Sequence, residues 1–278
     1  MNSNPGKELR QALRDGVLPF IGIYDAFSAT VAARHYPALF VSGFGFAASY
    51  YGLPDTGFVA WADILAFFQR LRLTVPAPHL LVDIDDGFGD TDVACHVASA
   101  LEAQGASGIV LEDQRRPRRC GHLDGKSVLD LDEYLVKLRR VLAARTDLFV
   151  VARTDAAEPD EIVRRLKAFA EAGADAVLAD GLRDLALLGE VSRQIQCPLT
   201  FNQIAGGKSP PCTVAELGKL GVRLVIYSTP CLFAAQAAID DALIALKEGG
   251  GLLPPNPRVS VASCTKMLKE NLRGQEAR

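Results

Sequence analysis

The chain has 278 residues, of which 49% are hydrophobic and 23% charged, and these proportions are typical of a globular protein with a large core. A formal net charge of −3 and a pI of about 5.9 argue against nucleic acid or an anionic membrane surface as a partner. The N-terminal segment lacks the apolar stretch of a signal peptide. The sequence also contains no run of about eighteen apolar residues, the length that a membrane-spanning helix needs. Six scattered cysteines without a CxxC pair favour free thiols and a cytoplasmic location.

Short β-branched segments alternate with longer amphipathic segments along the chain. The predicted strands are Pro19–Tyr24, Ala38–Ser42, Leu80–Ile84, Gly108–Glu112, Leu148–Arg153, Ala176–Ala179, Leu199–Asn202 and Leu224–Tyr227. The predicted helices lie near residues 27–36, 60–73, 91–104, 131–145, 158–172, 183–195, 213–220 and 231–248. This alternation over about 250 residues predicts an α/β fold, specifically a (β/α)8 TIM barrel. A Rossmann sheet is disfavoured because no GxGxxG follows the first strand.

The predicted catalytic barrel occupies residues 1–248, and residues 249–278 form a linker and a packing helix. Three consecutive glycines and the segment LLPPNP break the last barrel helix. One more helix is predicted over Val259–Leu272, and a helix of this length is not stable alone. It therefore packs on its own barrel or on a neighbouring subunit, and the sequence leaves both arrangements open.

Acidic residues gather at the ends of two neighbouring predicted strands, on the rim that carries the active site of a TIM barrel. Asp83 and Asp85 alternate, so a regular strand would direct both carboxylates to the same side. Glu112 at the end of the next strand adds a third carboxylate. Crowded carboxylates repel one another unless a cation neutralises them, and their hard oxygens favour Mg²⁺, with Mn²⁺ as a substitute. The alternative is a strand-end turn in which Asp residues form the turn and cap the next helix.

A basic loop, RRPRRCGHLDGK from Arg115 to Lys126, follows the fourth predicted strand. Neighbouring cations lower the pKa of a thiol, so Cys120 is a candidate acid/base rather than a structural residue. The five basic side chains are candidate ligands for an anionic substrate. An ordinary solvated loop with an incidental cysteine is the alternative.

Arg153 ends the apolar segment LFVVARTDA, where a guanidinium requires an anionic partner. That partner is either an internal carboxylate or the carboxylate of a substrate, which arginine binds through two parallel hydrogen bonds. Arg153 is therefore a candidate substrate clamp.

Several segments, in this order and spacing, resemble the isocitrate lyase and phosphoenolpyruvate mutase superfamily: VSGFGFAASYYGLPDTG, LVDIDDGFGD, LEDQ, RRCGH, VARTDA and NQIAGGKSP. The resemblance extends from about Tyr24 to the end of the eighth helix. It is closest to the 2-methylisocitrate lyases, the 2,3-dimethylmalate lyases and the oxaloacetate-cleaving members. It implies a Mg²⁺-binding barrel and a homotetramer in which the eighth helix is exchanged between subunits.

The resemblance also implies a role for each matching residue. It makes Asp83 the direct metal ligand and lets three further acids hold metal-bound water, namely Asp55, Asp85 and Glu112. It makes Cys120 the acid/base within a mobile gate formed by Arg119, Cys120, Gly121 and His122, and it makes Arg153 the substrate clamp. The other candidate substrate contacts are Tyr24, Ser42, Gly43, Phe44, Asp83, Gly121, Asp180 and Asn202.

The implied reaction cleaves a carbon–carbon bond in a small 2-hydroxy or 2-oxo di- or tricarboxylate, giving a 2-oxo acid such as pyruvate. Cys120 would protonate the enolate fragment, which requires a thiol pKa near the working pH although the basic loop lowers it. Asp180 and Ala205 stand where such lyases usually carry Glu, so we expect a substrate other than 2-methylisocitrate. A P–C bond enzyme of the carboxyphosphoenolpyruvate mutase type and a non-catalytic binding barrel remain as alternatives.

Overall fold

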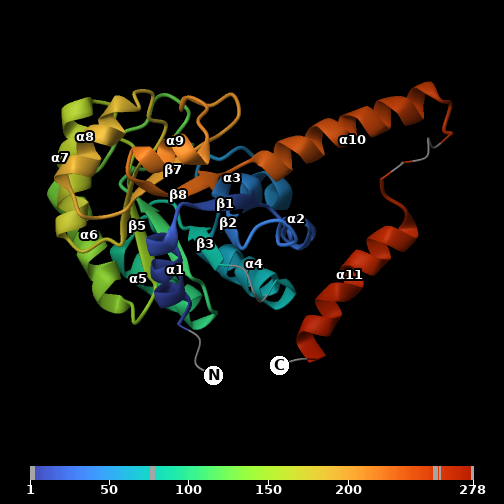
Figure 1. Ribbon diagram of the computed structural model, residues 1–278, viewed down its shortest axis with the longest axis horizontal. Helices are drawn as coiled ribbons and strands as arrows, with labels where there is room; N and C mark the ends of the chain where they lie inside the picture. The colour runs from blue at the N-terminus through green and yellow to red at the C-terminus, as the bar shows by residue number, and fades with distance from the viewer. Residues whose placement is uncertain (1–3, 76–78, 253–255, 257, 277–278) are drawn as a thin grey trace.

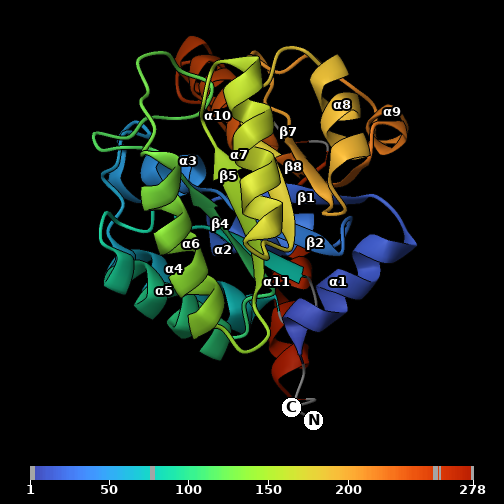
Figure 2. The same cartoon turned by 90° about the vertical axis from the view of Figure 1, so that its left-hand side faces the viewer.

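A computed structural model describes residues 4–75, 79–252, 256 and 258–276. Its centre is a closed barrel in which parallel strands follow one another in chain order and β8 returns to β1 (Figures 1 and 2). The strands are β1 (Leu18–Ile23), β2 (Ala38–Val41), β3 (His79–Asp83), β4 (Gly108–Glu112), β5 (Phe149–Thr154), β6 (Ala176–Ala179), β7 (Leu199–Asn202) and β8 (Val222–Tyr227). Each predicted strand is found within one or two residues of its expected bounds, so the TIM-barrel prediction is confirmed.

Helices surround the barrel, as Figure 2 shows. They are α2 (Ala26–Ala32), α4 (Trp61–Thr74), α5 (Thr91–Ala103), α6 (Leu131–Ala144), α7 (Pro159–Glu171), α8 (Ala186–Gln194) and α9 (Val214–Lys219). Local signals explain their ends. Thr213 and Glu216 form a reciprocal capping box at the start of α9. Gly173 has a φ of 98° just after α7, a left-handed conformation that favours glycine at the end of a helix.

A helix that was not predicted, α1 (Pro5–Asp15), covers the end of the barrel where the strands begin. Its Leu9 and Leu13 are buried in one cluster with residues from the starts of several strands, among them Ala38 and Phe149. Arg10 on the same helix forms an ion pair with Asp175 at 2.8 Å. In the sequence, this helix is indicated by a proline at its start and by two leucines four residues apart.

The segment after β2 is helical, although its glycine-rich composition suggests a loop. It contains α3 (Gly43–Phe46) and a π-helix, η1 (Ala47–Tyr51). Ser42 begins this unit because its Oγ accepts a hydrogen bond from the Gly45 amide at 3.1 Å. A helix therefore begins directly beside the carboxyl end of β3.

The last helices extend beyond the barrel. Figure 1 shows α10 (Pro230–Glu248) running outward from it, and no residue of α10 is buried. The predicted tail helix is present as α11 (Val261–Glu276), and Asn271 donates a hydrogen bond to Thr30 of α2 at 2.9 Å. Part of the expected linker, at residues 253–255 and 257, lies outside the described residues. Within the described chain, no helix combines the length and apolar character needed to cross a membrane.

Candidate active site

Four carboxylates meet at the carboxyl end of the barrel, where β3 and β4 finish. Asp83 and Glu112 are the last residues of these two strands. Asp85 does not continue β3, as the alternation argument assumed, because it has a φ of 52° and lies in the following turn. A Cβ on Gly43 would nevertheless lie 3.2 Å from both Asp83 Oδ2 and Asp85 Oδ1. The two acids thus face the same glycine at the start of α3.

Arg118 inserts its guanidinium among these carboxylates, and it is 2% exposed. Its Nη1 lies 2.5 Å from Asp55 Oδ1 and 3.3 Å from Asp85 Oδ1. Its Nε donates to Glu112 Oε1 at 2.8 Å. Burial opposes the charge of Arg118, but the three carboxylates raise its pKa well above the ordinary value. In this structure internal acids pair with Arg118, which the sequence makes one of five candidate ligands for an anionic substrate.

The remaining acids suit a hard cation. Burial raises the pKa of Asp85 to about 7 and also raises the pKa of Asp83. Both carboxylate oxygens of Asp85 are buried without a hydrogen bond. In the described part of the chain no three His, Cys, Asp or Glu side chains are grouped so that they could hold a metal ion together. Arg118 lies among three of the acids and contacts each of them. A divalent cation would fit at Asp83 and Asp85, where Asp85 Oδ1 also lies 3.3 Å from Arg118, while Asp55 and Glu112 are paired with Arg118 at shorter distances.

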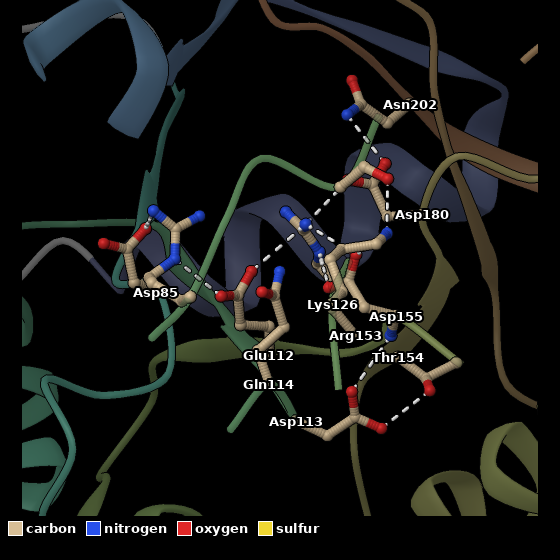
Figure 3. Close-up of polar contacts among 12 residues, drawn as sticks. Asp85, Glu112, Asp113, Gln114, Lys126, Arg153, Thr154, Asp155, Asp180 and Asn202 are labelled. Atoms are coloured by element: carbon tan, nitrogen blue, oxygen red, sulfur yellow. Dashed lines mark hydrogen bonds and ion pairs between the residues drawn. The ribbon is translucent and has the colours of Figure 1, made fainter. Parts of the chain in front are cut away.

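Arg153 lies at the centre of a second set of carboxylates (Figure 3). Its Nε is 2.9 Å from Asp155, and its Nη2 is 2.8 Å from Asp180 and 3.2 Å from Glu112. Burial opposes its charge, but these acids raise the pKa of Arg153 well above the ordinary value. Internal partners therefore hold the side chain in place and keep it cationic.

Asp180 links Arg153 to two further polar side chains. Asn202 donates to Asp180 through Nδ2 at 2.9 Å, and Ser228 donates to Asn202 Oδ1 at 2.7 Å (Figure 3 shows the first contact). His122 Nε2 lies 3.5 Å from Asp180. Burial raises the pKa of Asp180, but Arg153 and His122 outweigh it and hold that pKa well below the usual range. Asp180 is thus an ionised group that orients its neighbours.

The loop with Cys120 lies over both sets of acids. The Cys120 amide donates to the backbone oxygen of Asp55 at 3.1 Å, and the side chain is buried. A Cβ on Gly121 would lie 1.9 Å from Asp180 Oδ2 and 2.6 Å from Arg153 Nη2. Only glycine lets the loop approach so closely, and the loop is closed over the site in this structure.

The thiol of Cys120 does not have the lowered pKa expected from its basic neighbours. Burial, followed by the nearby charges of Asp55 and Asp180, raises its pKa to about 12. The expectation failed because the cations of the loop are directed elsewhere. Arg115 pairs with Glu133 at 3.4 Å, and Arg116 pairs with Asp86 at 2.8 Å.

Hydrogen bonds also hold the C-terminal part of the loop. Lys126 donates to Asp155 at 2.7 Å and also to the backbone oxygen of Gly121. The amide of Lys208, from the segment after β7, donates to His122 Nδ1 at 2.9 Å. The sequence makes Lys126 a candidate substrate ligand and does not reveal the role of Lys208, because the partners of both lysines become their neighbours only in the folded chain.

The other candidate substrate contacts occupy different places. The Ser42 side chain caps α3, and the ring of Phe44 packs edge-on against Phe233 with centroids 6.1 Å apart. Tyr24 lines an apolar cavity of about 510 Å³ together with Phe27 and others. Four of the candidates lie in or directly beside the two sets of carboxylates: Gly43, Asp83, Asp180 and Asn202.

The chain is similar in sequence to several known proteins. A family model for phosphoenolpyruvate phosphomutase matches residues 9–247. The chain is 34% identical over 235 residues to the petal death protein of Dianthus caryophyllus, covering 82% of this chain and 74% of that one. It is 33% identical over 256 residues to the 2-methylisocitrate lyase of Escherichia coli, covering 89% of this chain and 86% of that enzyme.

Solved structures are similar over nearly the whole chain. Oxaloacetate acetylhydrolase with the inhibitor 3,3-difluorooxalacetate superposes with a TM-score of 0.92 at 30% identity, covering 99% and 97% of the two chains. A 2,3-dimethylmalate lyase gives a TM-score of 0.90 at 29% identity, with 100% and 94% covered. Phosphonopyruvate hydrolase in complex with oxalate and Mg²⁺ gives 0.84 at 27% identity, with 99% and 98% covered. On these matches and this fold, the chain belongs to the phosphoenolpyruvate mutase/isocitrate lyase superfamily.

Proposed function

We propose that the protein is a Mg²⁺-dependent lyase that breaks a carbon–carbon bond in a small 2-hydroxy or 2-oxo di- or tricarboxylate and releases a 2-oxo acid such as pyruvate. One observation carries this proposal. The Cys120 thiol is buried beside Asp55, within a closed loop, and its pKa of about 12 keeps it protonated. This pKa lies above the value near the working pH that acid/base catalysis prefers. A carbanion is a far stronger base than a thiolate, so the protonated thiol can still donate its proton to it.

The carboxylates would hold the cation in the way that their contacts allow. Asp83 is the direct ligand in this proposal, with Asp85 beside it, while Asp55 and Glu112 act through water because Arg118 pairs with them. When bound, Mg²⁺ polarises the substrate oxygens and stabilises negative charge that develops on them. A related structure, phosphonopyruvate hydrolase, holds Mg²⁺ and oxalate.

The chain's own residues supply binding and proton transfer. Arg153 contributes a fixed positive charge to a substrate carboxylate, which approaches the guanidinium edge turned away from Asp155 and Asp180. A base takes the proton of the substrate hydroxyl, and the O–H electron pair forms the new C=O of the 2-oxo acid as the carbon–carbon bond breaks. The electron pair of the broken bond remains on the departing fragment as an enolate or carbanion. Cys120 then donates its Sγ proton to that carbon, and the resulting thiolate recovers a proton before the next cycle. The closed loop keeps water away from the carbanion until this transfer is complete.

The geometry constrains the substrate at the end that faces Asp180. Gly121 lies so close to Asp180 and Arg153 that a methyl group on it would overlap both side chains. Asp180 replaces a longer Glu, and Asn202 and His122 already contact it. These features support a substrate that differs from 2-methylisocitrate at the end facing Asp180.

A substrate panel tests the proposal. Purified protein is incubated with 2-methylisocitrate, 2,3-dimethylmalate, oxaloacetate, citramalate or phosphonopyruvate, each with Mg²⁺, with Mn²⁺ and with EDTA. Release of 2-oxo acid or oxalate is measured against release of phosphate, with Cys120→Ala as the control for contaminating activity. Metal-dependent carbon–carbon cleavage supports the lyase. Phosphate from phosphonopyruvate as the dominant product would replace it with the P–C bond alternative, and inactivity on the whole panel would contradict the lyase for these substrates.

A further inference from the structure

The loop that carries Cys120 has a narrow, hydrogen-bonded neck. Gln114 and Val128 form an antiparallel bridge, and the Arg115 amide donates to the Ser127 oxygen at 2.8 Å. Arg165 of α7 donates to the backbone oxygen of Leu129 at 2.8 Å and so fixes the end of this neck. These hydrogen bonds fix the neck, and the tip of the loop with Cys120 lies beyond them.

The side chain of Gln114 reaches from this neck into the loop. Its Nε2 donates to the backbone oxygen of Arg119 at 2.8 Å, and its Oε1 accepts from the Arg119 amide at 2.9 Å. The residue is 1% exposed, and it lies beside Glu112 in Figure 3. One primary amide therefore satisfies both backbone groups of the residue that precedes Cys120.

The next contacts along the chain continue this restraint. The Cys120 amide donates to the Asp55 oxygen at 3.1 Å, and the Leu123 amide donates to the Cys120 oxygen at 2.9 Å. The peptide between Arg119 and Cys120 is thus held from the neck on one side and from the carboxylate site on the other. We propose that Gln114 is a positioning residue that holds Cys120 over the site by clamping the backbone of Arg119. This role rests on the proposed function of Cys120 as the proton donor.

The chemistry of the clamp is specific for glutamine. Glutamate has the same shape, but it would place a second acceptor against the Arg119 oxygen, so one attraction becomes a repulsion. Methionine keeps the length and burial and removes both hydrogen bonds. Asparagine keeps both polar groups but is one methylene shorter. A role in packing alone would tolerate methionine, whereas the clamp requires the amide at its full length.

Thiol accessibility tests the clamp without a substrate. Wild type, Gln114→Glu and Gln114→Met are treated with iodoacetamide at pH 8, and alkylation is followed separately for each cysteine by peptide mass spectrometry. Cys197 is the internal control, because it is also a shielded thiol and lies between β6 and β7, where its Sγ contacts the Ala174 oxygen at 3.4 Å. Both variants should alkylate Cys120 about tenfold faster than wild type, which corresponds to about 1.4 kcal/mol of lost loop closure, while Cys197 is unchanged.

The reactivities of Cys120 and Cys197 together decide whether Gln114 acts as a clamp. Wild-type reactivity of Cys120 in both variants would overturn the clamp, and so would parallel acceleration of Cys120 and Cys197, which indicates general unfolding. Selective exposure of Cys120, with a fall in kcat on whichever substrate the panel identifies, supports it. If Cys120 is selectively exposed in the variants but the wild type cleaves no substrate of the panel, the result supports the clamp and contradicts the lyase proposal.

Discussion

Arg118 and Glu112 form a buried ion pair in which Nε donates to Oε1 at 2.8 Å. The same guanidinium also contacts Asp55. Arg118 belongs to the loop that carries Cys120, so this loop supplies a positive charge to both acids of the barrel rim. In the proposed function, closing this loop would therefore also neutralise part of the site. A change in the loop should alter the charge of the site, and a change in the site should alter the position of the loop.

Arg118→Met should destabilise the protein strongly. The change leaves Glu112 and Asp55 buried without their cation, and breaking a buried pair in this way costs about 3–5 kcal/mol. Urea unfolding in the presence of EDTA measures the effect, and Mg²⁺ should restore part of it. Arg115→Met is the matched control, because Arg115 is about half exposed in its pair with Glu133 and should cost less than about 1 kcal/mol. Equal losses for the two variants would contradict the buried-charge argument.

Cys120→Ser should abolish turnover and leave cation binding intact. A hydroxyl is a much weaker acid than a thiol, so kcat should fall by about 10²–10⁴-fold. Binding of Mn²⁺, followed by electron paramagnetic resonance, reports on the acids directly and should match wild type. Cys264→Ser, in the tail helix, is the control and should keep full activity. Full activity of Cys120→Ser would remove the proposed role of the thiol.

The raised pKa of Cys120 should make stability depend on pH in alkaline solution. An unfolded thiol ionises near pH 8.5, whereas the folded thiol has a pKa of about 12. The folded state therefore keeps a proton that the unfolded state loses, so the full contribution of the thiol to stability is present below about pH 8.5 and is lost as the pH rises toward 12. Between pH 7.5 and 9.5 the wild type should lose about 1.4 kcal/mol more than Cys120→Ser. Urea unfolding of both proteins at the two pH values measures this difference, and parallel curves would show that the thiol is not shielded.

Gly121→Ala should keep the fold but prevent loop closure. The new methyl group would lie 1.9 Å from Asp180 Oδ2 and 2.6 Å from Arg153 Nη2, both of which are fixed by other contacts. Misplacement of a catalytic group by about 1 Å costs roughly 10²-fold in rate, so kcat/KM should fall by at least that factor. Gly16→Ala is the control, since a Cβ there meets no atom within 4 Å. If both variants turn over normally, the loop does not have to reach the observed position.

The exposed face of α10 should be buried in an oligomer. Ile239, Leu243 and Ile244 are 57%, 59% and 54% exposed, and apolar residues spaced in this way on one helix usually contact a partner. We propose the homotetramer with exchanged helices, and light scattering coupled to gel filtration should give its mass. Ile239→Glu combined with Leu243→Glu should reduce that mass. Val136→Glu, at a residue 56% exposed on α6, should not. A wild-type monomer would contradict the proposal.

The sequence predicts the barrel well because strands and helices depend on local patterns. Buried strands such as β4 and β5 are continuous apolar segments, and their ends carry the acids and Arg153 as expected. The helix α1 was not predicted because it precedes the first strand and so lies outside the strand–helix alternation. The segment α3–η1 was not predicted because glycine and small residues have weak helix propensity, and the Ser42 cap with tertiary packing outweighs it here.

The contacts of the loop from Arg115 to Lys126 are the part of the structure that the sequence predicts least well. The pattern RRPRR does not reveal that Arg118 turns inward while Arg115 and Arg116 pair with Glu133 and Asp86. The basic sequence predicts a lowered pKa for Cys120, but burial, followed by the charges of Asp55 and Asp180, raises it. The contacts of the Gln114 amide could not be predicted either, because its partner becomes its neighbour only when the loop folds back.

In the proposed function, the position of α1 bears on the timing of the reaction cycle. Leu9 and Leu13 are packed at the strand-start end of the barrel, so substrate, product and cation would all pass under the Cys120 loop at the opposite end. Arrival and departure would then alternate, and the frequency of loop opening would set an upper limit on turnover. A compound that holds the loop down would trap whatever the site contains.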